Sequence, residues 1–131
     1  MTDDYQAMSS QGTTKMEAKN FDRGADERRS FDKGKLEIAN IGEETIARFR
    51  LEPGWKWSTS VKPMVNTPSC MQKHTGYVIS GKMHIRMDDG QETEVGPGDA
   101  MVIPPGHDAW IVGNEPFVGI DFTGAKTYTQ K

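Results

Sequence analysis

The chain has 131 residues, a length that suits one compact domain with a core of its own. Its net charge of −3, with acidic and basic residues interspersed, excludes the strongly basic surface that nucleic acid or an anionic membrane requires. No apolar run approaches the ~20 residues that cross a bilayer, and the first residues lack an apolar signal segment. We therefore expect a cytoplasmic protein with neither nucleic acid nor a membrane as a partner.

The first part of the chain predicts little regular structure. Residues 1–20 are polar and aperiodic, so we expect a flexible N-terminal tail. Residues 21–34 are charged around Phe21 and Phe31, and we interpret them as an arm draped over the domain, with one helical turn at 25–29. The predicted β-domain covers residues 35–124, and residues 125–131 form a C-terminal tail.

Alternating apolar residues begin the predicted β-domain. The runs 36–41 and 45–51 alternate on either side of Gly42, which predicts a hairpin. After the Pro53-Gly54 turn, Trp55 and Trp57 stand two apart, and therefore on one face of an extended segment. Residues 61–69 hold two prolines and are predicted to be a loop.

Short strands separated by turn residues fill the rest of the chain. An all-β sandwich or barrel is the architecture that this pattern predicts. The Asp89-Gly90 pair predicts a type I′ hairpin turn, in which both central residues have positive φ. The turn signals are Gly81-Lys82, Asp88-Asp89-Gly90, Gly96-Pro97-Gly98, Pro104-Pro105-Gly106 and Gly113-Asn114.

The stretch from Cys70 to Trp110 resembles the cupin family, whose motifs read G-x5-HxH-x3–4-E-x6-G and G-x5-PxG-x2-H-x3-N. Gly81 matches the glycine that closes the first motif, and Gly98, Pro104 and Gly106 match the second. The resemblance implies an all-β, cupin-like double-stranded β-helix, or jelly-roll barrel. It also implies a small-molecule ligand in the barrel pocket, with a divalent transition-metal site, or alternatively a metal-dependent cupin enzyme of the oxygenase or isomerase type.

The ligand positions of the first motif differ from the family pattern. With Gly81 aligned, the family's glutamate position falls on His74 and its second histidine on Cys70. The first histidine falls on Pro68, whose side chain cannot coordinate a metal. Cys70 is the only cysteine, so it forms no intramolecular disulfide and is a free thiol for packing, reactivity or metal ligation.

The second motif supplies a third candidate ligand. The family's histidine position holds Ala109 and its asparagine position Gly113, while His107 comes two residues before Ala109. Residues two apart on a strand share a face, so His107 is expected to point into the barrel if Ala109 does. The resulting Cys70, His74 and His107 cluster suits Zn²⁺, Fe²⁺ or copper better than Mg²⁺ or Ca²⁺. The alternative is a metal-free pocket in which the cysteine packs and a histidine bonds Asp108 or Asp121.

Aromatic and acidic residues complete the candidate pocket. Trp55, Trp57 and Trp110 are predicted either to form an aromatic wall for a planar ligand or to make core or dimer contacts. Asp121 lies in the last apolar strand, where a carboxylate must be paired, neutral or exposed to water. We interpret His84 as structural. The tryptophan pair and the edge strands of an open jelly roll favour a homodimer.

Overall fold

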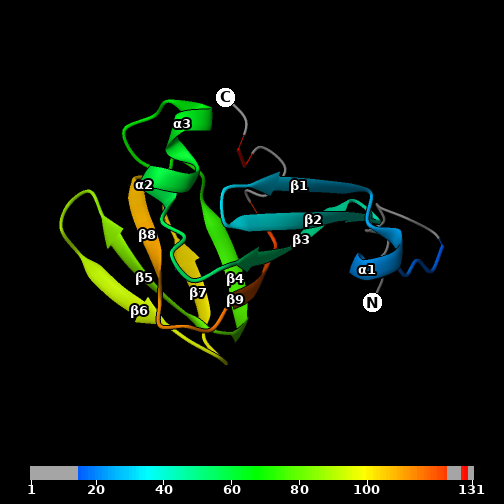
Figure 1. Ribbon diagram of the computed structural model, residues 1–131. Coiled ribbons are helices and arrows are strands. Elements are labelled where there is room, and N and C mark those ends of the chain that lie inside the picture. The colour runs from blue at the N-terminus through cyan, green and yellow to red at the C-terminus, as the bar shows by residue number, and fades with distance from the viewer. Residues whose placement is uncertain (1–14, 124–127, 130–131) are drawn as a thin grey trace, which may run out of the picture.

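The computed structural model describes residues 15–123 and 128–129, and within them the chain is mostly antiparallel β-structure (Figure 1). None of the described helices is long and apolar enough to cross a membrane. The helices are α1 (Phe21–Gly24), α2 (Trp57–Ser60) and α3 (Lys62–Val65). The strands are β1 (Glu27–Phe31), β2 (Gly34–Ile41), β3 (Glu44–Leu51), β4 (His74–Ser80), β5 (Lys82–Met87), β6 (Glu92–Val95), β7 (Ala100–Ile103), β8 (His107–Val112) and β9 (Phe117–Asp121).

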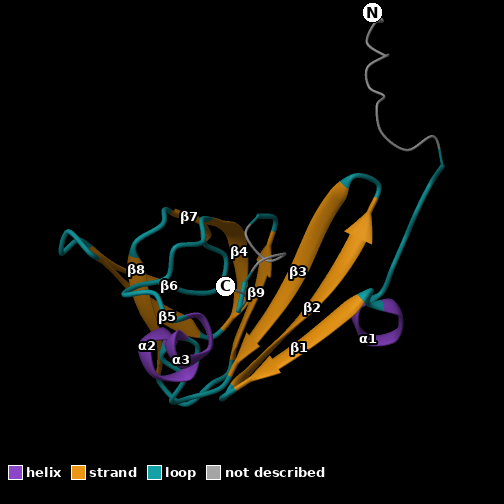
Figure 2. Cartoon of the chain, turned by 90° about the horizontal axis from the view of Figure 1, so that it is seen from above, coloured by secondary structure: helices purple, strands orange, loops and turns teal. Residues whose placement is uncertain are grey.

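The strands form two sheets. One has the order β1-β2-β3-β9-β4-β7, and the other has the order β6-β5-β8. Strands β1, β2 and β3 extend away from the part of the molecule that the remaining strands enclose (Figure 2). The buried core takes side chains from both sheets, such as Val78 on β4 and Ile85 on β5. The prediction of an all-β architecture is confirmed.

The predicted hairpin of 36–41 and 45–51 is present as β2 and β3. Its register pairs Leu36 with Phe49, and both side chains are buried. On the opposite face of β2, Glu37 is buried and accepts hydrogen bonds from Arg48 Nε at 2.9 Å and Arg28 Nη1 at 3.1 Å. Both faces of β2 are therefore covered.

The segment before the hairpin differs from the prediction. The helical turn expected at 25–29 is wrong, because α1 lies earlier, where the Asn20 side chain accepts hydrogen bonds from the backbone N–H groups of Asp22 and Arg23. Asparagine is a favoured residue at this capping position. Glu27–Phe31 is instead strand β1, which pairs antiparallel with β2. The predicted flexible tail lies partly outside the described residues, and Lys19 within it forms an ion pair with Asp26.

Two further local predictions are wrong for identifiable reasons. The predicted loop at 61–69 contains helix α3, which has a proline in its first turn and ends at Asn66, a residue with φ of 58°. Proline fits a helix start, since its missing N–H has no helical partner there. The Asp89-Gly90 turn is not type I′, because Gly90 has φ of 94° while Asp89 is not among the positive-φ residues. The Asp89 side chain accepts a hydrogen bond from Gln91 N instead.

Candidate functional site

The turn before β8 brings His107 against Cys70. The Cys70 N–H donates to the His107 carbonyl at 2.8 Å, and the Gly106 N–H donates to the Cys70 carbonyl at 2.8 Å. Gly106 has φ of 94°, a conformation that a residue with a side chain rarely adopts. The Pro104-Pro105-Gly106 turn therefore sets where both side chains lie.

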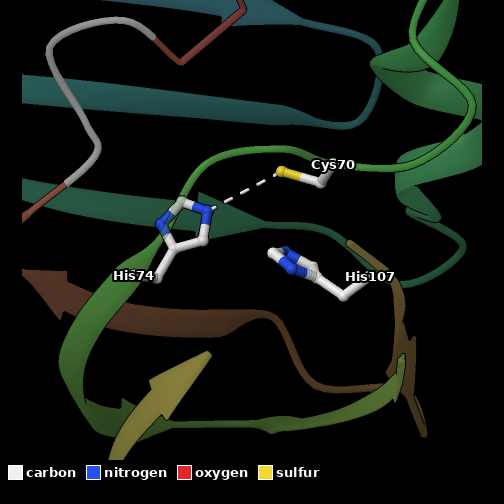
Figure 3. Close-up of side chains that lie close together, drawn as sticks. All are labelled: Cys70, His74 and His107. Atoms are coloured by element: carbon white, nitrogen blue, oxygen red, sulfur yellow. Dashed lines mark hydrogen bonds between the residues drawn. The ribbon is translucent and has the colours of Figure 1, made fainter. Parts of the chain in front are cut away.

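His74 reaches the same place from the first position of β4. Strand β4 pairs with β9 so that Gly76 lies opposite Asp121. The Nδ1–H of His74 donates to Asp121 Oδ2 at 2.5 Å, and its Nε2 lies 3.9 Å from Cys70 Sγ. The imidazole is thus held between the Asp121 oxygen on one side and the Cys70 sulfur on the other, and the dashed line in Figure 3 marks the contact with the sulfur.

The three predicted ligands converge. One ligand atom from each of Cys70, His74 and His107 lies within 4.8 Å of the others. His107 also uses Nδ1 for a hydrogen bond, to the Pro104 carbonyl at 2.8 Å. Both imidazoles are therefore oriented by an oxygen acceptor at Nδ1, which leaves Nε2 to coordinate a metal, the arrangement of metal-ligating histidines. The donors and their orientation fit a transition-metal ion.

The cluster is electrostatically coupled. Burial raises the pKa of Cys70, but hydrogen bonds from His107 and His74 outweigh it and bring the pKa down from 9.0 to about 6. Burial lowers the pKa of His74, but Asp121 and then Cys70 outweigh it and bring the pKa up to about 9. Near neutral pH the sulfur is therefore a thiolate, the form that ligates metals, while His74 is protonated, so a metal ion would have to displace the proton on its Nε2.

A cavity adjoins the cluster between the two sheets. Its volume is about 550 Å³, a figure that includes open solvent at the mouth, so the enclosed space is smaller. Ala109, Gly76 and Gly119 line it, and their small size leaves room where larger side chains would fill the interior. Apart from Cys70, His74, His107 and Asp121, most lining side chains are apolar, among them Phe49, Leu51, Met83, Ile103 and Phe117.

Most, but not all, of the predicted pocket residues line this cavity. Trp55, Trp57 and Asp121 do so together with the three candidate ligands. Trp110 does not: its ring stacks on His84 at 4.8 Å between centroids, and Lys56 Nζ lies 5.2 Å from its centroid. The three-tryptophan wall is therefore wrong for Trp110, because β8 turns His107 and Ala109 inward and Trp110 to the opposite face.

The sequence predicts Asp108 or Asp121 as the partner of a pocket histidine, and one of the two has that role. Asp121 pairs with His74, as described above. Asp108 instead accepts hydrogen bonds from the backbone N–H groups of Ser58 at 3.1 Å and Ala109 at 2.9 Å. Asp108 thereby connects the start of α2 to β8.

The sequence did not predict the cavity contact of Tyr128, which lies in the expected C-terminal tail. Its side chain is buried, and its ring centroid lies 5.0 Å from that of Phe49 and 5.6 Å from that of His74. Its carbonyl accepts a hydrogen bond from Arg29 Nη1 at 2.6 Å. Burial raises the pKa of Tyr128. A lone aromatic residue in a polar terminal segment was the only signal in the sequence.

The chain resembles known proteins in sequence over part of its second half and in fold over most of its length. The model of the cupin domain family matches residues 69–122. No curated protein matches the chain. Solved structures match the fold, with a TM-score of 0.59 for a protein of unknown function from Rhizobium leguminosarum bv. viciae 3841, at 21% identity over 83% of this chain and 96% of that one.

Two other structures are similar. The polyketide cyclase RemF from Streptomyces resistomycificus has a TM-score of 0.58 and 18% identity over 83% of this chain and 79% of that one. A DUF1255 protein of unknown function from Acidithiobacillus ferrooxidans has a TM-score of 0.54 and 20% identity over 73% of this chain and 85% of that one. At these identities the likeness is one of fold. The predicted cupin-like double-stranded β-helix is confirmed as the fold class.

Proposed function

We propose that the chain is a cupin-family protein that binds a divalent transition metal and a small molecule in the cavity, a proposal that the family match at residues 69–122 and the shared fold support. The metal ligands are Cys70, His74 and His107. The proposal also places the protein in the cytoplasm, where a free thiol stays reduced.

One observation carries the proposal: both histidines are held at Nδ1 by oxygen acceptors. Asp121 holds His74 and the Pro104 carbonyl holds His107, and one ring nitrogen of each lies within 4.8 Å of the Cys70 sulfur. A histidine that served only to pack would not need a carboxylate or carbonyl partner together with a thiolate neighbour. Outer hydrogen bonds of this kind orient metal-binding imidazoles in proteins.

The donor set selects among metals. A thiolate and two imidazoles suit Zn²⁺, Fe²⁺ or copper, whereas Mg²⁺ and Ca²⁺ prefer oxygen. Three protein ligands would leave a fourth coordination position for a water or a substrate, as in catalytic zinc sites. When bound, such an ion supplies Lewis acidity to an oxygen-bearing ligand. Asp121 and the Pro104 carbonyl would hold the Nδ1 protons of His74 and His107 while the ion is bound.

The open position also favours the alternative, a metal-dependent cupin enzyme of the oxygenase or isomerase type. The cavity next to the three ligands has room for a small substrate. The chain's own part in such a reaction would be to orient the substrate against its apolar wall and to exclude water.

Metal analysis tests the proposal. We expect protein purified without chelators to contain one transition-metal ion per chain, and metal-stripped protein to take up one Zn²⁺ in a calorimetric titration. Cys70→Ala, His74→Ala and His107→Ala should each lower the affinity by at least ~10–100-fold, because two donors remain. Zn²⁺ at 100 times its Kd should stabilise the wild type by about 2.7 kcal/mol.

His84→Ala is the matched control, since His84 lies outside the cavity and bonds Glu92 at 2.6 Å. It should leave metal uptake unchanged. Protein that holds no metal, takes up none and melts identically with and without chelator would contradict the proposal. Equal metal loss in His84→Ala would show that the effect is not specific to the cluster.

A further inference from the structure

Trp55 carries a buried hydrogen-bond donor without an acceptor. Its side chain is 3% exposed and lines the cavity, and among the described residues its indole Nε1–H has no hydrogen-bond partner. A buried N–H that has lost its water and gained no acceptor destabilises the folded state, so such groups are rare in native proteins. An occupant of the cavity that carries an acceptor atom would supply the missing partner.

The backbone of Trp55 lies beside the opposite end of β8 from His107. The Trp55 carbonyl accepts a hydrogen bond from Ile111 N at 3.1 Å, so its backbone lies beside the later part of β8. His107 is four residues earlier on that strand. At a rise of about 3.3 Å per residue, these two points on β8 are ~13 Å apart. Trp55 and His107 thus enter the cavity lining from backbone positions well apart on or beside β8.

The wall of the cavity is mostly apolar and includes flexible side chains. Met83 and Met101 line it, and unbranched methionine side chains adapt to the shape of an occupant at low cost. Among the described residues that line the cavity there is no lysine or arginine, and Lys56, next to Trp55, instead lies over the outward ring of Trp110. A carboxylate beside Trp55 would be buried without a cation, which is unfavourable. A neutral acceptor fits this end better.

We propose that the cavity binds a small molecule with an apolar body and a neutral carbonyl oxygen, and that this oxygen accepts a hydrogen bond from Trp55 Nε1–H. The other end of the molecule faces Cys70, His74 and His107. This inference rests on the proposed function, because it assigns the ligand class of the same cavity.

A pair of probes of equal shape tests the inference. Cyclohexanone carries a carbonyl oxygen, and methylenecyclohexane replaces it with a CH₂ group that cannot accept a hydrogen bond. We expect cyclohexanone to bind ~10-fold more tightly, the value of one hydrogen bond to an otherwise unpaired donor. In nitrogen-15 NMR spectra, the Nε1–H signal of Trp55 should shift with cyclohexanone and stay in place with methylenecyclohexane.

Conservative tryptophan variants identify the donor. Trp55→Phe keeps most of the ring and removes the N–H, so the preference for the ketone should disappear, whereas Trp57→Phe should keep it. Trp57→Phe and Trp110→Phe also assign the Trp55 signal by elimination among the three tryptophans, even if Trp55→Phe does not fold. Equal binding of both probes, binding of neither, or an unshifted Trp55 signal would overturn the inference.

The test separates this inference from the proposed metal site. Binding is measured on the full chain as purified and again after metal removal, with Zn²⁺ uptake followed in the same samples. Ketone preference without metal uptake would support the inference and contradict the metal site. Metal uptake without ketone preference would do the reverse.

Discussion

Asp121 connects the candidate metal site to the last strand of the sheet. Its Oδ2 accepts the hydrogen bond of His74, and its Oδ1 accepts one from Thr123 N at 2.8 Å. Asp121→Asn keeps the size of the side chain but removes the charge that stabilises the protonated imidazole. We expect the pKa of His74 to fall from about 9, measured by NMR titration, and the affinity for Zn²⁺ to drop ~10–100-fold, measured by calorimetry above about pH 9, where proton competition at Nε2 is weak in both proteins.

Asp108→Asn is the control for this change. Asp108 is also a partly buried carboxylate bonded to backbone N–H groups, but it does not contact the cluster. Its replacement should leave the Zn²⁺ affinity unchanged. An Asp121→Asn protein that binds Zn²⁺ as tightly as the wild type would show that the carboxylate does not orient His74 for a metal.

The thiol of Cys70 should titrate in the metal-free protein with a pKa of about 6 instead of 9.0. The folded-state pKa lies below the unfolded value, so the thiolate's contribution to stability is fully present above pH 9 and is lost as the pH falls through about 6. Ultraviolet absorbance of the thiolate measures the titration directly. His107→Phe should move the pKa upward, because it removes the largest stabilising hydrogen bond to the sulfur.

Strand parity explains which site residues could be predicted. It correctly placed His107 on the inner face with Ala109, since side chains alternate along any regular strand. The same rule turns Trp110 outward, so that correction was available from the sequence. The sequence alone could not decide whether a pocket histidine pairs with Asp108 or with Asp121. The pairing of His74 with Asp121 depends on the register between β4 and β9.

Gly81 shows why the motif glycines are needed at the turn between β4 and β5. Its φ is 77°, and a Cβ there would lie 2.5 Å from the Pro116 carbonyl oxygen and 2.6 Å from Phe117 Cα. These are backbone atoms that cannot move aside cheaply. We expect Gly81→Ala to destabilise the protein by about 3 kcal/mol or more in urea unfolding, through steric overlap added to the positive-φ cost.

Gly90→Ala separates the two contributions. Gly90 has φ of 94°, but a Cβ there meets nothing within 4 Å. Its replacement should cost only about 1 kcal/mol, the penalty of the left-handed backbone itself. Equal losses in the two variants would mean that the close approach at Gly81 is relieved by a backbone shift.

Elements defined by local chemistry were predicted better than those that depend on distant contacts. The β2–β3 hairpin followed from alternation on either side of Gly42. The strand at Glu27–Phe31 was missed because its charged sequence does not alternate, and pairing with β2 determines its conformation. Helices α2 and α3 have four residues each, too short to show a helical period in the sequence.

The cavity exists only at the scale of the whole molecule. Its walls come from both sheets, from the segment before α2 and from Tyr128 close to the end of the chain. Such contacts between distant segments leave no periodic signal in the sequence, which is why Tyr128 was assigned to a tail. The domain boundaries predicted from the sequence stay predictions.

The homodimer also stays a prediction, but its expected surface changes. Trp55 and Trp57 are 3% and 2% exposed within the chain itself, so they are not available to a partner. Exposed apolar residues lie instead on the outer face of the neighbouring strands β4 and β7, where Tyr77, Ile79 and Val102 are 45%, 49% and 61% exposed. Contiguous apolar surface of this kind favours protein contact, and a second copy would bury it symmetrically.

Charges on this face should therefore keep the chain monomeric. In the double variant Tyr77→Lys and Val102→Lys, desolvation of two ammonium groups opposes association, while the exposed positions leave the fold intact. Sedimentation should give twice the chain mass of 14.6 kDa for the wild type and the single mass for the variant. Glu94→Lys, on the exposed strand β6 of the other sheet, is the control and should remain dimeric. A wild type that sediments as a monomer at high concentration would contradict the predicted dimer.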